Sequence, residues 1–335
     1  MKKLALIATT MLAAMPCLAG LYIISNADFT NPDFTLTFNI QDISRLQTIL
    51  TNESYQGGVT IKIDDGTILT TESKKLVQHQ FTSVGVHKVR IYSNGYNPDF
   101  SMRGIPEITK VVFGQNTKIR TRFSGCTGIK TAVFPPRLGE FNVPMPEWFR
   151  NCTSLETVSM PRLRAFPTYM NYTFAGCNSL KEVSLPNVTN LLTYAFENCT
   201  NLTTFSATNL LFVGNNSKNF SGCSNLMTVI TPKLEAVPTY FLFQLPSLKN
   251  VDLSSAKELY PSAIRECPNL ERLSLPSCTN IMNGGLSWNP NLTRLEVPLI
   301  DKATVQQNAW SVWWVRYPGC VIVCKDGEEY IVTQP

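Results

Sequence analysis

The chain has 335 residues, of which 44% are hydrophobic, and its 29 Lys and Arg against 24 Asp and Glu give a formal net charge of +5. This length allows two or three domains, and the apolar content argues against extended disorder. Because the positive charge is small and no dense Lys/Arg run occurs, the composition argues against nucleic acid as a partner.

Residues 1–19 have the pattern of a signal peptide: two lysines, an apolar run and small residues up to Ala19, after which we expect cleavage. Cys17 offers a lipid-anchor alternative, but Pro16 stands where a lipoprotein signal has a small residue. An uncleaved anchor is a third interpretation, although the apolar stretch is short for a bilayer. We therefore expect a secreted or cell-surface protein whose mature part has no membrane span.

Residues 21–100 have the alternation of strands. Residues 34–40 and 59–64 alternate apolar and polar side chains, and Asp65-Gly66 is a turn signal. The acidic-Gly-Thr turn and the later run Gly85-Val-His-Lys-Val resemble the polycystic-kidney-disease-type immunoglobulin-like domain, although His87 stands where that family has an aromatic residue and its Trp is missing. The resemblance implies a small β-sandwich, which would cover the open edge of the repeats that follow.

The two histidines of the chain, His79 and His87, both fall in this region. A catalytic imidazole needs an orienting acid and a nucleophile within reach, and no sequence motif supplies them. Asp64 and Asp65 are adjacent, so on a strand they point to opposite faces and do not form a glycosidase pair. We predict no catalytic residue, no metal site and no cofactor.

From Met102 to Pro298 one motif recurs nine times, and its reference position holds mostly cysteine. A Phe-like residue stands three positions before it, Leu or Ile three after, and Val or Leu six after, often followed by Leu-Pro. A period of 20 to 30 residues is typical of a stacked solenoid. The reference positions are Ile105, Cys126, Cys152, Cys177, Cys199, Cys223, Leu245, Cys267 and Asn289.

The alternation at the end of each unit predicts one short strand with a buried face, stopped by proline and followed by a return path. The stacked strands would form a parallel sheet over a continuous core. In an exported protein, cysteines suggest disulfides. Because Ile105 and Leu245 occupy the same position, we favour small buried thiols over disulfides.

The motif Phe-x-x-Cys-x-x-Leu-x-x-Val-x-Leu-Pro, clearest at residues 149–161 and 174–186, resembles the BspA-like class of leucine-rich repeats found in exported proteins of Bacteroidetes. This resemblance covers residues 101–300. It implies a surface location and an adhesive or host-binding role, but no particular ligand.

Residues 301–335 would close the solenoid. Residues 304–314 fit a short helix, and Asp326-Gly327 marks a hairpin turn between two apolar runs. The predicted fold is therefore mainly β: a signal peptide (1–19), an immunoglobulin-like sandwich (21–100), about nine leucine-rich repeats with a parallel sheet (101–300) and a hairpin cap (301–335).

The side chains on either side of the buried strand position point outward from the sheet. We predict that this face binds an extracellular protein, of a host or a neighbouring cell, without catalysis. An ordinary solvated strand face is the competing interpretation. The candidate residues are Glu182, Thr204, Thr228, Asn250, Asp252, Arg272, Arg294 and Glu296.

Two other functions stay open. Trp310, Trp313 and Trp314 could form an aromatic platform for a glycan, although a tryptophan cluster at a solenoid end is more often part of a closing core. A structural spacer without any ligand is the remaining alternative.

Overall fold

The structure of the protein is a computed structural model. It describes residues 32–53, 58–72, 74–93, 99–114, 120–134, 147–160, 163–164, 171–282, 284–298 and 318–333. All of these belong to one compact unit that extends from Asn31 to Pro335. The predicted signal peptide, residues 1–19, lies outside the described residues.

Two mainly antiparallel sheets form the N-terminal part. The first has the strand order β11-β10-β8-β1-β6-β3-β4 and the second β5-β2-β7-β9. Phe34 of the first sheet meets Phe100 of the second with ring centroids 6.1 Å apart, in agreement with the predicted small sandwich. The strands of this part are β1 (Phe34–Ile40), β2 (Gln47–Asn52), β3 (Val59–Ile63), β4 (Ile68–Thr71), β5 (Lys75–His79), β6 (Gly85–Ser93), β7 (Asp99–Ser101) and β9 (Arg120–Arg122).

Strand β1 joins the sandwich to the repeats. Its two neighbours are β6 and β8 (Ile108–Phe113), and both pairings are antiparallel. Because β8 is the strand of the first repeat unit, β1 covers the edge that this unit would otherwise leave open.

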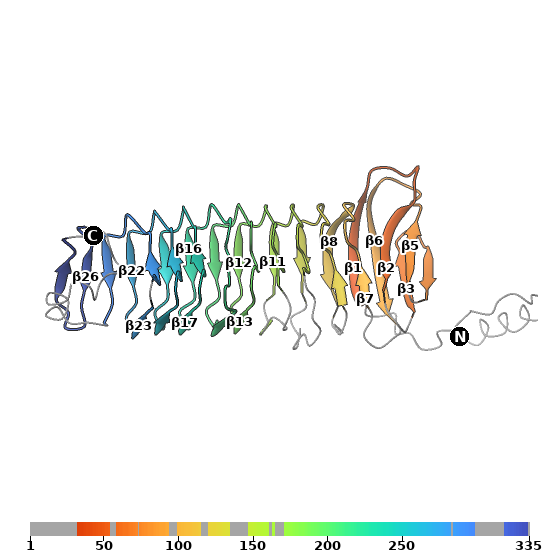
Figure 1. Cartoon of the computed structure of the whole chain (residues 1–335). Coiled ribbons are helices and arrows are strands. Elements are labelled where there is room, and N and C mark those ends of the chain that lie inside the picture. Colours follow the sequence, from red (N-terminus) through yellow and green to blue (C-terminus); the bar gives the residue numbers. More distant parts are fainter. Residues whose placement is uncertain are drawn as a thin grey trace, which may run out of the picture. The chain divides into compact units, whose positions relative to one another are not determined.

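The nine repeat units each contribute one strand to the same face of a solenoid, and these strands stand side by side in chain order (Figure 1). Within three segments of this row, β8 to β11, β12 to β19 and β22 to β25, neighbours pair in parallel and in the register of the repeat, as Thr204 does with Thr228. The predicted parallel sheet is confirmed. Its strands are β8, β10 (Thr131–Val133), β11 (Thr157–Ser159), β12 (Glu182–Ser184), β14 (Thr204–Ser206), β16 (Thr228–Ile230), β19 (Asn250–Asp252), β22 (Arg272–Ser274) and β25 (Arg294–Glu296).

The return path carries further strands that the sequence did not predict. They form two more rows of parallel strands. One row consists of the sheets β13-β15 and β17-β20-β23, and the other is the sheet β18-β21-β24. Each is two residues long, too short to show an alternating pattern. They are β13 (Asn190–Leu191), β15 (Phe212–Val213), β17 (Ala236–Val237), β18 (Leu242–Phe243), β20 (Glu258–Leu259), β21 (Ile264–Arg265), β23 (Asn280–Ile281) and β24 (Leu286–Ser287).

Repeated side chains stack into columns in the core. The rings of Phe123, Phe149, Phe174 and Phe196 lie nearly parallel, with successive centroids 5.3, 5.8 and 5.5 Å apart. All four are buried. Such stacking explains why one unit alone is unstable, since the apolar face of each coil is covered only by its neighbours.

The cysteine column holds free, buried thiols, so the interpretation without disulfides agrees with the structure for the nine described cysteines. Each thiol of the column lies against a backbone carbonyl of the preceding unit; Cys199 Sγ, for example, is 3.1 Å from the Phe174 oxygen. At Asn289, which replaces cysteine, Nδ2 donates to the equivalent carbonyl of Ile264 at 3.1 Å. Seven of the nine units therefore place a buried donor in this column, while Ile105 and Leu245 fill it with apolar side chains.

Burial also makes these thiols weak acids. Desolvation raises the pKa of Cys126, Cys223 and Cys267 to about 12, because a thiolate loses its hydration in an apolar core. The thiol form therefore persists at neutral pH, and these cysteines are poor nucleophiles in the folded protein.

A hairpin closes the C-terminal end, as predicted. Strand β26 (Val321–Val323) pairs in parallel with β25 and antiparallel with β27 (Glu329–Ile331). The Asp326–Gly327 turn is held by a hydrogen bond from the Gly327 N–H to the Cys324 carbonyl at 3.0 Å. The predicted helix at 304–314 lies outside the described residues.

Candidate binding surface

The predicted binding residues lie on the exposed side of the first sheet. Each flanks an inward side chain at the strand centre, as Thr204 and Ser206 flank the buried Phe205. None of the eight is buried. Their positions are Glu182 on β12, Thr204 on β14, Thr228 on β16, Asn250 and Asp252 on β19, Arg272 on β22, and Arg294 and Glu296 on β25.

Six of the eight residues border one shallow hollow of about 500 Å³ on β16, β19, β22 and β25. Glu182 and Thr204 lie on the same sheet face but do not line it. The hollow also involves Lys249 and Ser274, which were not among the predicted residues. Ser274 is in an outward position of the repeat, whereas Lys249 lies just before β19, where the alternation gives no signal.

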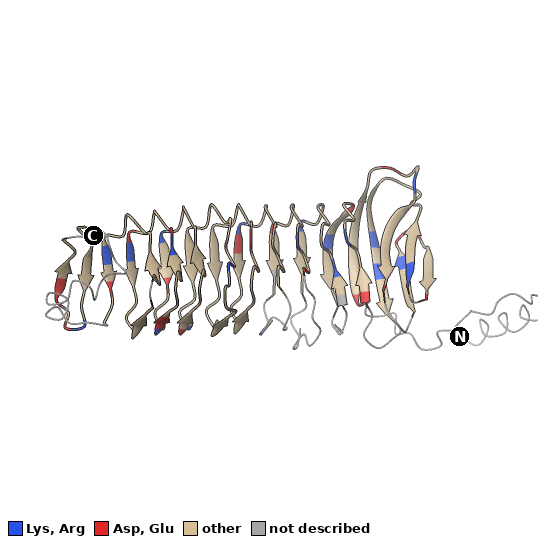
Figure 2. Ribbon diagram, in the orientation of Figure 1, with Lys and Arg blue, Asp and Glu red and all other residues tan. Residues whose placement is uncertain are grey.

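Charged side chains concentrate at the C-terminal end of this face, while β14 and β16 carry none (Figure 2). Arg294 Nη1 is 2.8 Å from Oε1 of Glu329 in the hairpin. Ser274 Oγ donates to Glu296 Oε2 at 2.7 Å. Arg272 pairs in register with Arg294 and has no ion pair within the described part of the chain. Arg272 is thus free to meet an anionic group of a partner.

The histidines have acidic neighbours that the sequence did not reveal. His79 Nε2 is 2.7 Å from Asp65 Oδ2, and His87 Nδ1 is 3.1 Å from Asp64 Oδ1. Asp64 and Asp65 thus serve different imidazoles, and Asp65 also accepts the Thr67 N–H of the predicted turn. The long separation along the chain, 14 and 23 residues, hides both pairs from sequence analysis.

His87 also approaches a serine, in an arrangement with the outline of a Ser-His-Asp triad. Ser83 Oγ is 3.4 Å from His87 Nε2. However, the Ser83 carbonyl is closer to the same nitrogen, at 2.9 Å. A carbonyl accepts only, so Nε2 carries a proton that it donates there and is not free to take one from the hydroxyl. This cluster stabilises the start of β6 and does not have the geometry of an activated nucleophile.

Two further searches were confined to the described ranges. No helix there is long and apolar enough to cross a bilayer, and no three His, Cys, Asp or Glu side chains gather as metal ligands. Trp310, Trp313 and Trp314 lie outside those ranges, so the glycan platform predicted from them stays a prediction.

Comparison with known proteins bears on the repeats. Among solved structures, a leucine-rich repeat protein from Bacteroides ovatus ATCC 8483 is 22% identical over 59% of this chain and 57% of that chain, with a TM-score of 0.43. A leucine rich cell surface protein from Faecalibacterium prausnitzii A2-165 is 16% identical over 74% of this chain and 88% of that chain, with a TM-score of 0.27. The chain thus spans little more than half the length of the Bacteroides ovatus protein. None of the curated proteins compared with the chain matches it.

The family model for the BspA type leucine rich repeat region matches six copies of its motif, over residues 98–217 and 213–311. The match does not extend to residues 21–97, so the polycystic-kidney-disease-type resemblance of that part stays a prediction. The matched segments cover more than half of the chain and coincide with the stacked coils. This chain belongs to the BspA-type leucine-rich repeat family.

Proposed function

We propose that this chain is a non-catalytic binding protein, exported by its first 19 residues, that recognises an extracellular protein through the exposed face of its first sheet. The observation that carries the proposal is the convergence of six outward residues on one hollow at the charged end of that face. In this proposal residues 101–300 present the surface, and residues 21–100 and 301–335 protect the two ends of the sheet.

The charge arrangement favours a partner that offers a carboxylate. Arg272 and Arg294 are neighbours on adjacent strands, and like charges placed side by side across strands are unfavourable. Glu329 offsets the charge of Arg294, which leaves Arg272 to pair with an acidic side chain of the partner. Asp252 and Glu296 border the same hollow, so a basic group beside the acidic one would complete the match.

The test compares charge reversals on and off the sheet face. The full chain and the double variant Arg272→Glu/Arg294→Glu are screened against an array of extracellular proteins. The control is Lys233→Glu/Lys257→Glu, which changes the net charge equally but lies on the exposed return path. We expect selective binding that the first variant loses and the control keeps.

The thermal midpoint should change little in either variant, since exposed ion pairs such as Arg294–Glu329 contribute about 1 kcal/mol or less. Binding that survives the Arg272→Glu/Arg294→Glu change would contradict the proposed surface. A blank array for the unmodified chain would favour the spacer alternative.

A further inference from the structure

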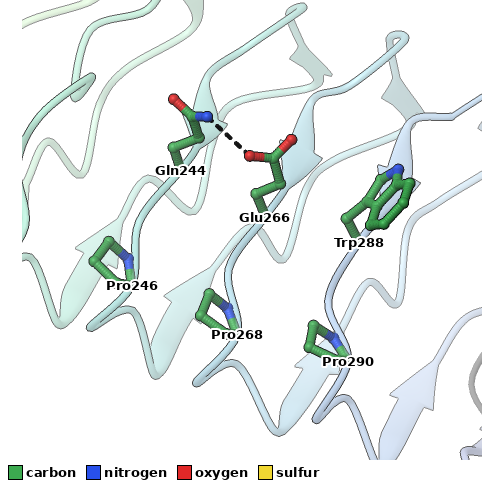
Figure 3. Close-up of a pocket in the computed structure, with 6 residues that line it drawn as sticks. All are labelled: Gln244, Pro246, Glu266, Pro268, Trp288 and Pro290. Atoms are coloured by element: carbon green, nitrogen blue, oxygen red, sulfur yellow. Dashed lines mark hydrogen bonds between the residues drawn. The ribbon is translucent and has the colours of Figure 1, made fainter.

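A second hollow, of about 430 Å³, lies on a different side of the last units and shares no lining residue with the first. Its side chains come from three consecutive coils, and they form two rows (Figure 3). Gln244, Glu266 and Trp288 stand in one row, each directly before the cysteine-column position. Pro246, Pro268 and Pro290 form the other, two residues later.

The first row departs from what its backbone favours. The column before the reference position has positive φ in all nine units, and the six units before Gln244 place Gly or Asn there. Gln244, Glu266 and Trp288 keep φ values of 56, 58 and 59°, which are unfavourable for long side chains. Long side chains adopt positive φ elsewhere in the array too, as Tyr172 and Tyr240 do, so it is the exposure of Trp288 that sets this row apart.

Trp288 does not pack into the core. Its side chain is 68% exposed, whereas Trp148, the other described tryptophan, is fully buried. With the three prolines of the second row, this exposed indole forms an apolar patch of the kind that contacts a ligand.

The polar neighbours are already ordered. Gln244 Nε2 donates to Glu266 Oε2 at 2.8 Å (Figure 3), and Arg265 Nε lies 3.0 Å from Glu266 Oε1. The Gln244 carbonyl oxygen and the remaining lone pairs of the carboxylate still accept hydrogen bonds. Since Arg265 balances the charge of Glu266, the row is nearly neutral.

The proline row is equally fixed. The side-chain amide of Asn269 donates to the Pro246 carbonyl at 2.6 Å, and that of Asn291 to the Pro268 carbonyl at 2.7 Å. The hollow therefore has a rigid apolar ledge beside a line of hydrogen-bond acceptors. With about 4.8 Å between coils, the three units extend over roughly 10 Å.

We propose that Gln244, Glu266 and Trp288 form a binding site for a short neutral oligosaccharide, separate from the protein-binding face. A pyranose ring has an apolar C–H face, which can stack on the indole of Trp288. Its hydroxyl groups can donate hydrogen bonds to the acceptors of Gln244 and Glu266 in the same row. The near-neutral lining disfavours a strongly charged ligand, and the preformed geometry limits the entropy lost on binding.

The test uses an array of neutral glucan, mannan and galactan oligosaccharides with the full-length chain, followed by calorimetry on the strongest ligand. The variant Trp288→Asn removes the indole and installs the residue that the same column uses elsewhere, so the turn is preserved. Phe212→Ala is the matched control, because Phe212 is also exposed, at 56%, but lies on β15.

We expect Trp288→Asn to weaken binding about tenfold or more, as loss of a central aromatic anchor does, while Phe212→Ala and Arg272→Glu/Arg294→Glu bind like the unmodified chain. Glu266→Gln should weaken binding to a smaller extent. The proposal is overturned if no oligosaccharide binds, if Trp288→Asn binds normally, or if only Trp313→Ala abolishes binding. It is also overturned if the Trp288→Asn change removes a protein ligand while no sugar binds.

Discussion

Replacement of Cys199 tests why the repeat column holds cysteine. Its side chain is fully buried, and its thiol lies 3.1 Å from the Phe174 carbonyl of the preceding unit. Cys199→Ala removes a group about the size of a methylene, worth about 0.8 kcal/mol of transfer free energy. A cavity term of similar size is added where the site cannot collapse, and loss of the weak hydrogen bond adds about 0.5 kcal/mol. The expected decrease in the free energy of unfolding is about 2 kcal/mol.

The variant Cys199→Ser separates volume from hydrogen bonding. A hydroxyl keeps a donor towards the Phe174 carbonyl, so we expect serine to destabilise the protein by only about half as much as alanine. Cys278 provides the control: it is buried to the same extent, but its thiol lies 3.6 Å from Asn280 of its own unit and makes no bond between coils.

Urea unfolding followed by circular dichroism gives the free energies. At Cys278, serine should bring no advantage over alanine, because burial of a hydroxyl without a well-placed acceptor is unfavourable. The reasoning about the column is refuted if Cys199→Ser is as unstable as Cys199→Ala, since only side-chain volume would then matter.

Three further outcomes follow from the core. Folding raises the pKa of the column thiols above the ordinary value of 9.0, to about 12 for Cys126 and Cys223. Their contribution to stability is therefore complete below pH 9 and is lost towards pH 12, by about 1.4 kcal/mol per thiol and pH unit. In urea titrations at pH 8 to 10.5, the free energy of unfolding should decline less steeply for Cys199→Ser than for the unmodified chain. The described cysteines should not react with an aromatic disulfide reagent at pH 8 until denaturant is added, and rapid reaction in buffer would contradict their burial. Gly222→Ala should lower the free energy of unfolding by about 1–3 kcal/mol, because Gly222 has φ 78° and a Cβ there would stand 2.1 Å from Asn198 Oδ1. Gly66→Ala is the control for the backbone contribution, since Gly66 also has positive φ but a Cβ there would meet no atom within 4 Å.

The parts of the fold that were predictable are those that repeat. The nine strands and their outward faces follow from a spacing that recurs across about 200 residues, so that each unit supports the interpretation of the others. The two-residue strands of the return path escaped because no period can be read from two residues. The His87–Asp64 pair escaped for another reason: its partners are brought together only by the pairing of β3 with β6.

The candidate surfaces were likewise predictable only where they follow the repeat. Outward positions such as Arg272 and Glu296 were predictable from alternation alone, and the hollow they border was not, since its depth depends on which neighbours are small. Trp288 was missed as a site residue because it falls where the repeat has Gly or Asn, a column that the apolar pattern does not define. The signal was present in the substitution itself: a residue unsuited to positive φ at a place where the array otherwise uses suitable ones.

Both proposed sites lie in the last units, and this location has a structural reason. A stacked repeat folds as long as its buried columns are filled, so its outward positions and turns are free to vary. In the middle of the array most outward positions are small and hydroxyl-bearing, and the position directly before the cysteine is Gly or Asn. From Gln244 onward, long polar and aromatic side chains occupy the position directly before the cysteine column, while Arg272 and Arg294 enter the sheet face. Neither change improves the core, and the positive-φ substitutions oppose stability. Because neither change contributes to the core, selection for binding explains why both occur in the same units.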